Sequence, residues 1–353
     1  MAFEIGIHTF GEISPDPFTR RVPSALERMR DTVEQAVVAE QAGLDVFGVG
    51  EHHRGDFIAS SPAVMLAAIA ARTCKIRLTS AVTVLSSLDP VRLFQDFATL
   101  DLVSGGRAEI IAGRGSHIDS FPLFGYDLAD YDALFAEKLE LLVAIRNEHP
   151  ISWQGTFRPA LDAADVAPRP VQSRLPIFVG VGGTPSSGAR AGRLGLPLAY
   201  GVLLGRVDDA LRVDEAYNSA AVGAGYDPRS LDKTIAGHGF VARTSQEARD
   251  LMYPYFSNGM VANARHRAQA GPRMPRPMFD TQASPVGALM AGSPQEVIDK
   301  LMLQHELYNN NRVLVYMGLG GVPQQDHLKA IELLGTEVAP VLRKEITVTQ
   351  PVA

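Results

Sequence analysis

The stretch VFGVGEHH, from Val46 to His53, decides how the rest of the chain is read. It is an apolar run of strand length that ends at three adjacent ionisable residues, Glu51, His52 and His53. Such a run is typical of a buried strand that delivers polar side chains to the rim of a site. If the strand belongs to a parallel sheet, similar runs separated by helices are expected along the chain.

The chain does alternate in this way on both sides of the stretch. Apolar residues at helical spacing predict helices over 25–42 and 131–147, among others. Eight such units in 353 residues predict one domain over 1–353, an α/β fold of the closed (β/α)8 TIM barrel type with insertions at its C-terminal mouth. An open doubly wound sheet is disfavoured because no GxGxxG follows the first strand. The predicted strands lie at 3–8, 44–50, 76–84, 107–113, 177–181, 198–203, 234–242 and 312–317.

Two stretches interrupt the alternation. Residues 151–170 indicate a small hairpin before the fifth strand. Residues 257–287 are irregular and rich in proline and glycine, and they are too long for a simple connection. We predict that this second stretch is a lid or insertion within the domain.

Composition limits the classes of function. Hydrophobic residues make up 46% and charged residues 20%, as in an ordinary globular protein, and the net charge of -6 provides no basic surface for nucleic acid. The only cysteine is Cys74, which excludes a disulfide framework and favours a reducing cytoplasm. No apolar run is long enough to predict a membrane span. A small-molecule partner in the cytoplasm is therefore expected.

The carboxyl ends of all strands in a barrel meet at one mouth, so polar groups that are distant in sequence converge there. The turn from Gly182 through Gly183 and Thr184 to Ser187 offers open backbone, hydroxyls and a helix N-terminus, which suits a phosphate. A tight glycine turn with a serine cap is the structural alternative. Arg114, between two glycines, adds a guanidinium that can hold a phosphate through two oxygens. An ion pair of Arg114 with Glu51 or Asp119 would be an equally good account of that residue alone.

The paired histidines invite a metal hypothesis, because imidazole is a common zinc ligand. Successive side chains on a strand point in opposite directions, however, and no third ligand occurs at a recognisable spacing. We therefore expect no metal site. His53 fits a structural role, whereas an inward-facing His52 could act as a base, an acid or a hydrogen-bond donor. The aromatic residues Phe121, Phe124, Tyr126, Tyr131 and Trp153 fit a packed cap on the mouth and a substrate wall equally well.

Taken together, VGEHH, the block from Thr79 to Tyr126 and the segment GGTPSSGARAGRLGLPL resemble the bacterial luciferase-like flavin-dependent monooxygenases, in order and over nearly the whole chain. The resemblance implies a barrel that binds FMN at its mouth and uses reduced flavin and O2 to oxygenate a small organic substrate. A separate reductase would supply the reduced flavin.

Position by position, the resemblance implies roles for individual residues. His52 matches the catalytic histidine beside the flavin, and Arg114 matches the arginine on its phosphate. Gly182, Gly183, Thr184 and Ser187 fall in the phosphate-binding turn. Ala81 and Val82, followed by Thr83, match a non-proline cis peptide beneath the flavin ring.

The sequence also departs from luciferase. Gly113 stands where the light-emitting enzyme has a reactive cysteine, so light emission is not expected, and Gly183 replaces an acidic residue of the phosphate turn. The sequence does not decide whether the substrate is an aldehyde, an alkane, an amine or a sulfur compound. The alternatives are an F420-dependent hydride-transfer oxidoreductase and a non-catalytic flavin-binding protein. Relatives often pair through the helices beside the second and third strands, so a homodimer or higher homo-oligomer is expected, with 62–71 in the contact.

Overall fold

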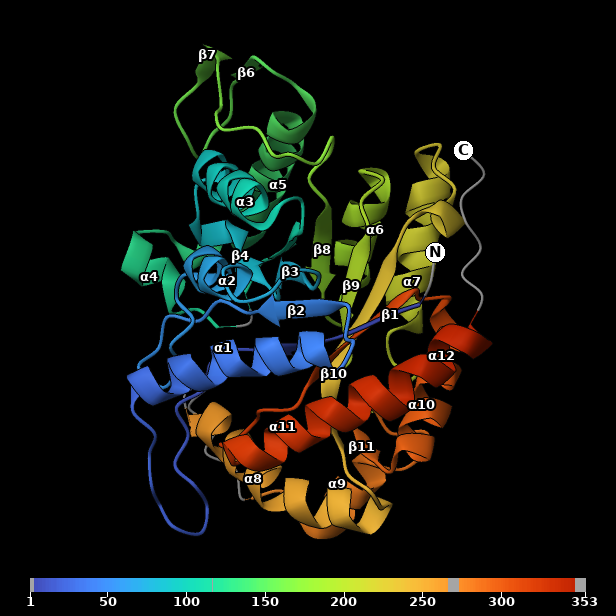
Figure 1. Ribbon diagram of the computed structural model, residues 1–353. Coiled ribbons are helices and arrows are strands. Elements are labelled where there is room, and N and C mark those ends of the chain that lie inside the picture. Colours follow the sequence, from blue (N-terminus) through green and yellow to red (C-terminus); the bar gives the residue numbers. More distant parts are fainter. Residues whose placement is uncertain (1–2, 116, 266–272, 347–353) are drawn as a thin grey trace.

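The structure is a computed structural model that describes residues 3–115, 117–265 and 273–346. Eight parallel strands form a closed barrel, in which every strand pairs with the strand on each side of it (Figure 1). The pairing of β9 with β10 closes the ring. The prediction of a (β/α)8 barrel is confirmed. The barrel strands, in spatial order, are β1 (Glu4–Thr9), β2 (Val46–Val49), β3 (Arg77–Ser80), β5 (Ala108–Gly113), β8 (Ile177–Val181), β9 (Leu198–Gly201), β10 (Lys233–Val241) and β12 (Arg312–Tyr316).

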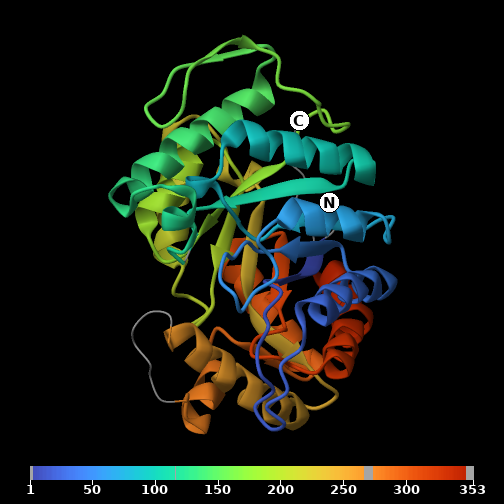
Figure 2. The same ribbon diagram turned by 90° about the vertical axis from the view of Figure 1, so that its left-hand side faces the viewer.

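Helices surround the barrel on its outside, as Figure 2 shows when the view is turned by 90°. The predicted helix over 131–147 is present with the same bounds, and the predicted helix over 25–42 ends one residue earlier. The helices are α1 (Ala25–Gln41), α2 (Pro62–Ala70), α3 (Pro90–Ser104), α4 (Ser120–Phe124), α5 (Tyr131–Asn147), α6 (Pro185–Arg193), α7 (Leu211–Gly223), α8 (Ser245–Arg265), α9 (Arg276–Gln282), α10 (Pro294–Tyr308), α11 (Gln324–Leu333) and α12 (Ala339–Glu345).

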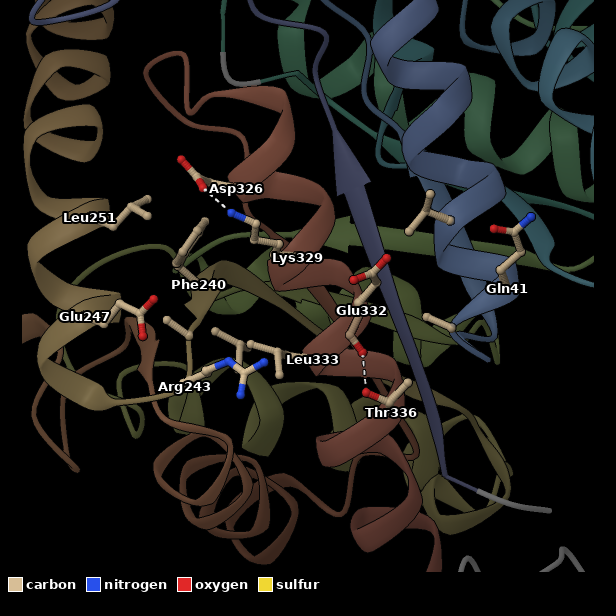
Figure 3. A pocket seen from close by; sticks show the side chains of 14 residues that line it. Gln41, Phe240, Arg243, Glu247, Leu251, Asp326, Lys329, Glu332, Leu333 and Thr336 are labelled. Carbon is tan, nitrogen blue, oxygen red and sulfur yellow. Dashed lines mark hydrogen bonds and ion pairs between the residues drawn. The ribbon is translucent and has the colours of Figure 1, made fainter.

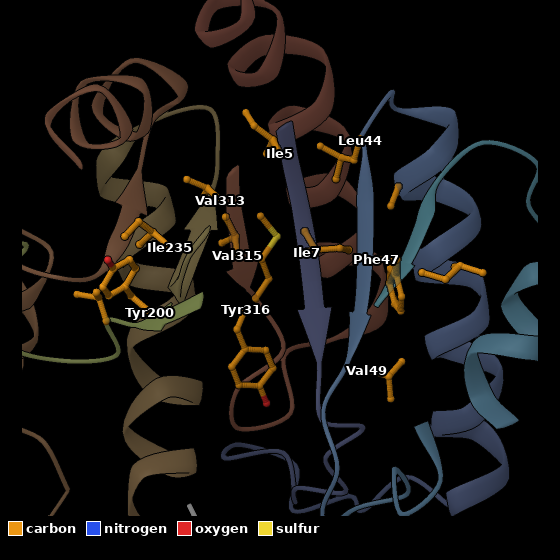
Figure 4. Packing of buried hydrophobic residues seen from close by; sticks show 14 of the residues in the cluster. Ile5, Ile7, Leu44, Phe47, Val49, Tyr200, Ile235, Val313, Val315 and Tyr316 are labelled. Atoms are coloured by element: carbon orange, nitrogen blue, oxygen red, sulfur yellow. The ribbon is translucent and has the colours of Figure 1, made fainter. Parts of the chain in front are cut away.

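The strands alternate between two cores, as the period of two along a strand requires. Ile5, Ile7, Val313 and Val315 point outward from β1 and β12 into the layer shared with the helices (Figure 4). The other face of the strands fills the barrel with a smaller apolar cluster, made of Val46, Ala81, Ile111, Phe178, Ala199 and Leu314.

Charged residues close the barrel at the amino end of its strands. Arg312 donates to Glu109 across the interior at 2.7 Å and 3.1 Å, and both side chains are buried. Burial alone would raise the pKa of Glu109, but the guanidinium groups of Arg312 and Arg77 hold that pKa below its ordinary value. This buried ion pair fills the amino end of the barrel, so a ligand site is expected at the opposite end, the mouth.

The predicted hairpin over 151–170 is present as β6 (Ile151–Trp153) and β7 (Leu161–Ala164), which pair antiparallel. The predicted irregularity over 257–287 is wrong in part. Residues 257–265 continue α8 beyond Pro254, and residues 276–282 form α9. Buried Met252, Tyr255 and Phe256 hold α8 against the core around its proline, so packing overrides the local helix-breaking signal. Residues 266–272 of this stretch lie outside the described residues.

Candidate active site

A cavity of about 270 Å³ lies at the carboxyl ends of the barrel strands. Its wall consists mostly of glycine and apolar side chains, with polar groups at a few positions. Those polar side chains are His8, Glu51, His52, Arg114 and Tyr131. A larger hollow of about 470 Å³ lies among α1, α8, α11 and the end of β10, and charged residues of both signs such as Arg243, Glu247 and Lys329 line it (Figure 3). This second hollow contains none of the predicted site residues, so the mouth cavity is the candidate site.

The strand predicted over 76–84 is interrupted in the structure. It divides into β3 and β4 (Thr83–Val84), with a cis peptide between Ala81 and Val82 at the break. Val82 lies against two glycines of neighbouring strands. A Cβ atom on Gly113 would lie 2.6 Å from the Val82 side chain, and one on Gly180 would lie 2.7 Å from it. Because β5 and β8 have glycines at these two positions, the Val82 side chain has room to pack in the cavity wall.

Glu51 and His53 fasten the end of β2 to β4. The Glu51 carboxylate contacts His53 Nε2 through Oε1 at 2.8 Å, and its Oε2 accepts the Val84 N–H at 2.9 Å. Both side chains are buried. His53 also packs edge-on against Phe124, with ring centroids 5.0 Å apart. These contacts hold the segment that carries His52.

His52 lines the cavity and is surrounded by other aromatic rings. Its ring centroid lies 4.3 Å from that of Phe57, 4.8 Å from that of Phe10 and 4.7 Å from that of His117. Burial, together with the neighbouring His117 and Arg54, lowers the pKa of His52 to about 3. The imidazole is therefore neutral at pH 7 and carries one donor and one acceptor nitrogen.

Arg114 connects the end of β5 to the start of α6. It donates to the Ser187 hydroxyl at 2.9 Å and to the Asp132 carboxylate at 2.5 Å, and it stacks over the Tyr131 ring at 5.1 Å. The ion pair considered from the sequence, with Glu51 or Asp119, is not the one that forms. Arg190 Nη2 lies 3.9 Å from the same Asp132 carboxylate, so two guanidinium groups share one exposed carboxylate.

The glycine turn before α6 is open to solvent. Residues 182–186 are exposed, and a Cβ atom on Gly182 or Gly183 would meet no atom within 4 Å. Thr184 is the N-cap of α6 but its side chain makes no capping hydrogen bond. α6 begins with Pro185, which has no N–H, and the Ser187 N–H donates to the Thr184 carbonyl at 3.0 Å. An anion at this corner would therefore contact the Arg114 guanidinium and the exposed backbone of the turn rather than a row of free helix N–H groups.

The structure brings most of the predicted residues together. Five of them line the cavity: His52, Ala81, Val82, Arg114 and Gly182. Ser187 contacts the cavity group Arg114, whereas Gly183 and Thr184 lie on the exposed turn beyond it. Thr83 is buried in β4 and does not line the cavity.

The aromatic residues of the mouth separate into different roles. Tyr131 lines the cavity, and the buried Phe121 packs against it with ring centroids 5.5 Å apart. Trp153 lies in the β6–β7 hairpin. The sequence analysis did not identify Asp132, which contacts Arg114, or His8, which lines the cavity. Asp132 stands in the first turn of a helix, where an acidic residue is common, so no sequence signal marks it as a partner of Arg114.

Within the described ranges, no group of three or more histidine, cysteine, aspartate or glutamate residues is placed to hold a metal ion. The same ranges contain no helix that is both long and apolar enough to cross a membrane.

Comparison with known proteins identifies relatives with two kinds of activity, a monooxygenase and an F420-dependent dehydrogenase. The N-acetyl-S-alkylcysteine monooxygenase of Bacillus subtilis is 27% identical over 313 residues, which cover 83% of this chain and 88% of that protein. The F420-dependent glucose-6-phosphate dehydrogenase of Amycolatopsis mediterranei is 25% identical over 325 residues, covering 89% and 95% of the two chains.

A solved structure has the same fold. The oxygenating constituent of 3,6-diketocamphane monooxygenase from Pseudomonas putida, in complex with FMN, superposes with a TM-score of 0.78 at 20% identity. The match covers 99% of this chain and all of that one. The model of the luciferase-like monooxygenase family matches residues 3–310. The chain therefore belongs to the luciferase-like monooxygenase family.

Proposed function

We propose that this protein is an FMN-dependent monooxygenase that uses reduced FMN and O2 to oxygenate a small organic substrate. One observation carries the proposal: a single cavity is lined by the guanidinium of Arg114, which contacts Ser187, and by the neutral, buried imidazole of His52. A flavin mononucleotide has its phosphate and its reacting ring at opposite ends, so it needs two such ends in one cavity.

The residues of the mouth fit FMN. Arg114, Ser187 and the exposed backbone of the turn after Gly182 would hold the phosphate. The Ala81–Val82 segment, seated against Gly113, gives an apolar wall without protruding side chains on which a flat ring can lie. When bound in its reduced form, FMN would supply the electrons that activate O2.

His52 would act beside the reacting ring. Because its imidazole is neutral at pH 7, it can accept a proton at one nitrogen while it donates a hydrogen bond from the other. Glu51 and His53 would position it through their contacts with each other and with Val84. The apolar wall would keep bulk water away from the reacting atoms.

Further parts of the proposal rest on the family or on the sequence. A separate reductase would supply reduced flavin, the reaction would take place in the cytoplasm, and residues 257–265 and 273–287 would cover the mouth as parts of a lid. Copies of the chain would pair through α2 and α3, where Val64, Leu102 and Val103 expose apolar side chains.

An F420-dependent hydride transfer is the second candidate, because relatives of comparable identity use F420. It would place the longer F420 tail beyond the same Arg114 corner. A monooxygenase with the same fold over 99% of this chain has been solved in complex with FMN, which favours FMN. FMN is therefore the cofactor that we propose.

The test is a titration of the purified protein with FMN, with reduced FMN and with F420, followed by rapid mixing of the reduced-FMN complex with O2. Tighter binding of reduced FMN than of F420, with O2 consumption that depends on added organic compounds, supports the proposal. Preference for F420 supports the second candidate. Binding of oxidised FMN without O2-dependent turnover would identify a non-catalytic flavin-binding protein, and His52→Ala would then change no measured property.

A further inference from the structure

Three neighbouring strands carry polar aromatic side chains at one level of the barrel mouth. In the strand register, His8 of β1 lies opposite Tyr316 of β12, and His238 of β10 lies opposite the same tyrosine. The Tyr316 ring is 5.3 Å from the ring of His8 and 5.2 Å from that of His238, with tilts of 33° and 40°. We refer to His8, Tyr316 and His238 as the histidine wall.

The histidine wall faces the interior of the barrel. His8 itself lines the mouth cavity, as do Leu314 and Ala236. Tyr316 stands two residues after Leu314, and His238 two residues after Ala236, so each points to the same side of its strand as that cavity residue. The wall is therefore the next layer of side chains above the cavity floor, toward the mouth.

The wall lies across the barrel from the proposed phosphate corner. In the closed strand order, β12 is separated from β5 by three strands in either direction, so the two strands are diametrically opposite. Arg114 follows β5, and Tyr316 ends β12. A molecule bound between the Arg114 corner and this wall would contact opposite sides of the mouth.

The wall presents buried polar atoms. The Nδ1 atoms of His8 and His238 are buried and have no hydrogen-bond partner among the residues that the structure describes. Phe10 packs edge-on against His8 at 5.5 Å, and Phe256 packs edge-on against His238 at 5.4 Å, so the rings are held in place. A buried polar group without a partner is costly, and a ligand that supplies the partner is favoured for that reason.

The wall is uncharged at neutral pH. Burial and the neighbouring His238 lower the pKa of His8 to about 3, and burial lowers that of His238 to about 4. The carboxyl of Glu12 faces the Tyr316 hydroxyl and accepts the N–H of Gly320 at 3.0 Å. Neutral imidazoles beside an acidic group offer hydrogen bonds but no positive charge, so they do not favour an anion.

We propose that the histidine wall binds the organic substrate, and that this substrate is a neutral molecule whose oxygen or nitrogen function hydrogen-bonds to His8, the member of the wall that lines the cavity, with Tyr316 and His238 packed behind it. A plain hydrocarbon would leave the His8 Nδ1 atom without a partner, and a carboxylate would be desolvated without a compensating charge. The inference rests on the proposed function, because it assigns the substrate side of the same mouth.

The test uses three probes of similar shape with the purified full chain: acetophenone, ethylbenzene and benzoate. Histidine labelled with nitrogen-15 reports binding through the imidazole signals of His8 and His238, and no cofactor is added. Acetophenone is expected to shift the His8 signal more than the His238 signal and to bind at least about tenfold more tightly than benzoate or ethylbenzene. His8→Gln is expected to weaken acetophenone binding by about three- to tenfold, and His238→Gln by less.

His327→Gln is the matched control, because His327 is equally buried but lies on α11, outside the barrel. Equal affinity for acetophenone and ethylbenzene, preference for benzoate, loss of affinity in the control as large as in the wall variants, or binding of none of the probes overturns the inference. Because no flavin is present, failure of O2 turnover bears only on the proposed function, and failure of probe binding bears only on the wall.

Discussion

The guanidinium of Arg114 donates a hydrogen bond to the hydroxyl of Ser187 at 2.9 Å, although the two residues are 73 positions apart in the chain. The contact joins the end of β5 to the first turn of α6. It places a fixed positive charge beside the open backbone of the Gly182 turn, where a phosphate would be held by both.

Arg114→Ala is therefore expected to weaken FMN binding. Loss of hydrogen bonds to a charged group corresponds to a decrease in affinity of about 10- to 150-fold. Quenching of flavin fluorescence measures the dissociation constant. Arg229→Ala is the control, since Arg229 is an exposed arginine paired only with its neighbour Asp227. A change in affinity as small as in the control would mean that the phosphate lies elsewhere.

Asp132→Asn is expected to have the opposite effect. The Asp132 carboxylate contacts Arg114 and lies near Arg190, so it competes with a phosphate for both guanidinium groups. Removing an exposed carboxylate of this kind corresponds to a gain in FMN affinity of about two- to fivefold. The gain should shrink as salt is added, because screening reduces the repulsion that the mutation removes. Unchanged or weaker binding at low salt would show that Asp132 does not oppose the cofactor.

Gly113→Ala tests whether the packing of Val82 in the cavity wall depends on a glycine at position 113. The new Cβ atom would lie 2.6 Å from the Val82 side chain, so the cavity wall must shift. Overpacking of this kind costs about 1–3 kcal/mol of unfolding free energy, which a urea titration measures. Gly183→Ala is the matched control, because a Cβ atom there meets nothing within 4 Å. If both variants unfold at the same urea concentration, Val82 does not depend on the glycine.

His52→Ala is expected to separate turnover from binding. The side chain packs among aromatic rings and is not one of the groups that we propose for the phosphate, so FMN affinity should change little. O2-dependent turnover should fall by about 100-fold or more if the imidazole moves a proton. His53→Gln should instead lower stability, since His53 contacts the buried Glu51. An unfolded His52→Ala variant, or one with full turnover, would assign His52 a structural role.

The order of strands could be predicted from sequence because each barrel strand is a short apolar run between turn residues. The fifth run, Ile177–Val181, has the same bounds in the structure. The third run could not be divided in advance, because Thr79 to Val84 is uniformly β-branched or small and nothing in it marks the break at Ala81. The family resemblance, and not the pattern of residues, indicated the cis peptide.

The candidate site was predictable where residues stand at strand ends and not where they stand on helices. Arg114 follows β5 directly and His52 stands three residues after the end of β2, and barrel closure brings them to one cavity. Asp132 reaches Arg114 only because α5 begins beside the mouth, which depends on the length of the preceding loop. His8 and His238 lie within strands, and the spacing of residues in a strand does not show whether a histidine there lines a site or only packs in the core.

The buried histidines predict how stability depends on pH. Burial and the nearby Arg28 lower the pKa of His327 to about 3, below its ordinary value of 6.5. Between these two values the unfolded chain binds a proton at His327 and the folded chain does not, so stability falls as the pH decreases from about 6.5 toward 3 and is unaffected by this group at higher pH. The slope for one such group is at most about 1.4 kcal/mol per pH unit. Urea titrations at pH 7, 6 and 5 should show the decline, and His327→Gln should reduce it. An identical slope in the variant would mean that His327 takes up its proton in the folded state as readily as in the unfolded chain.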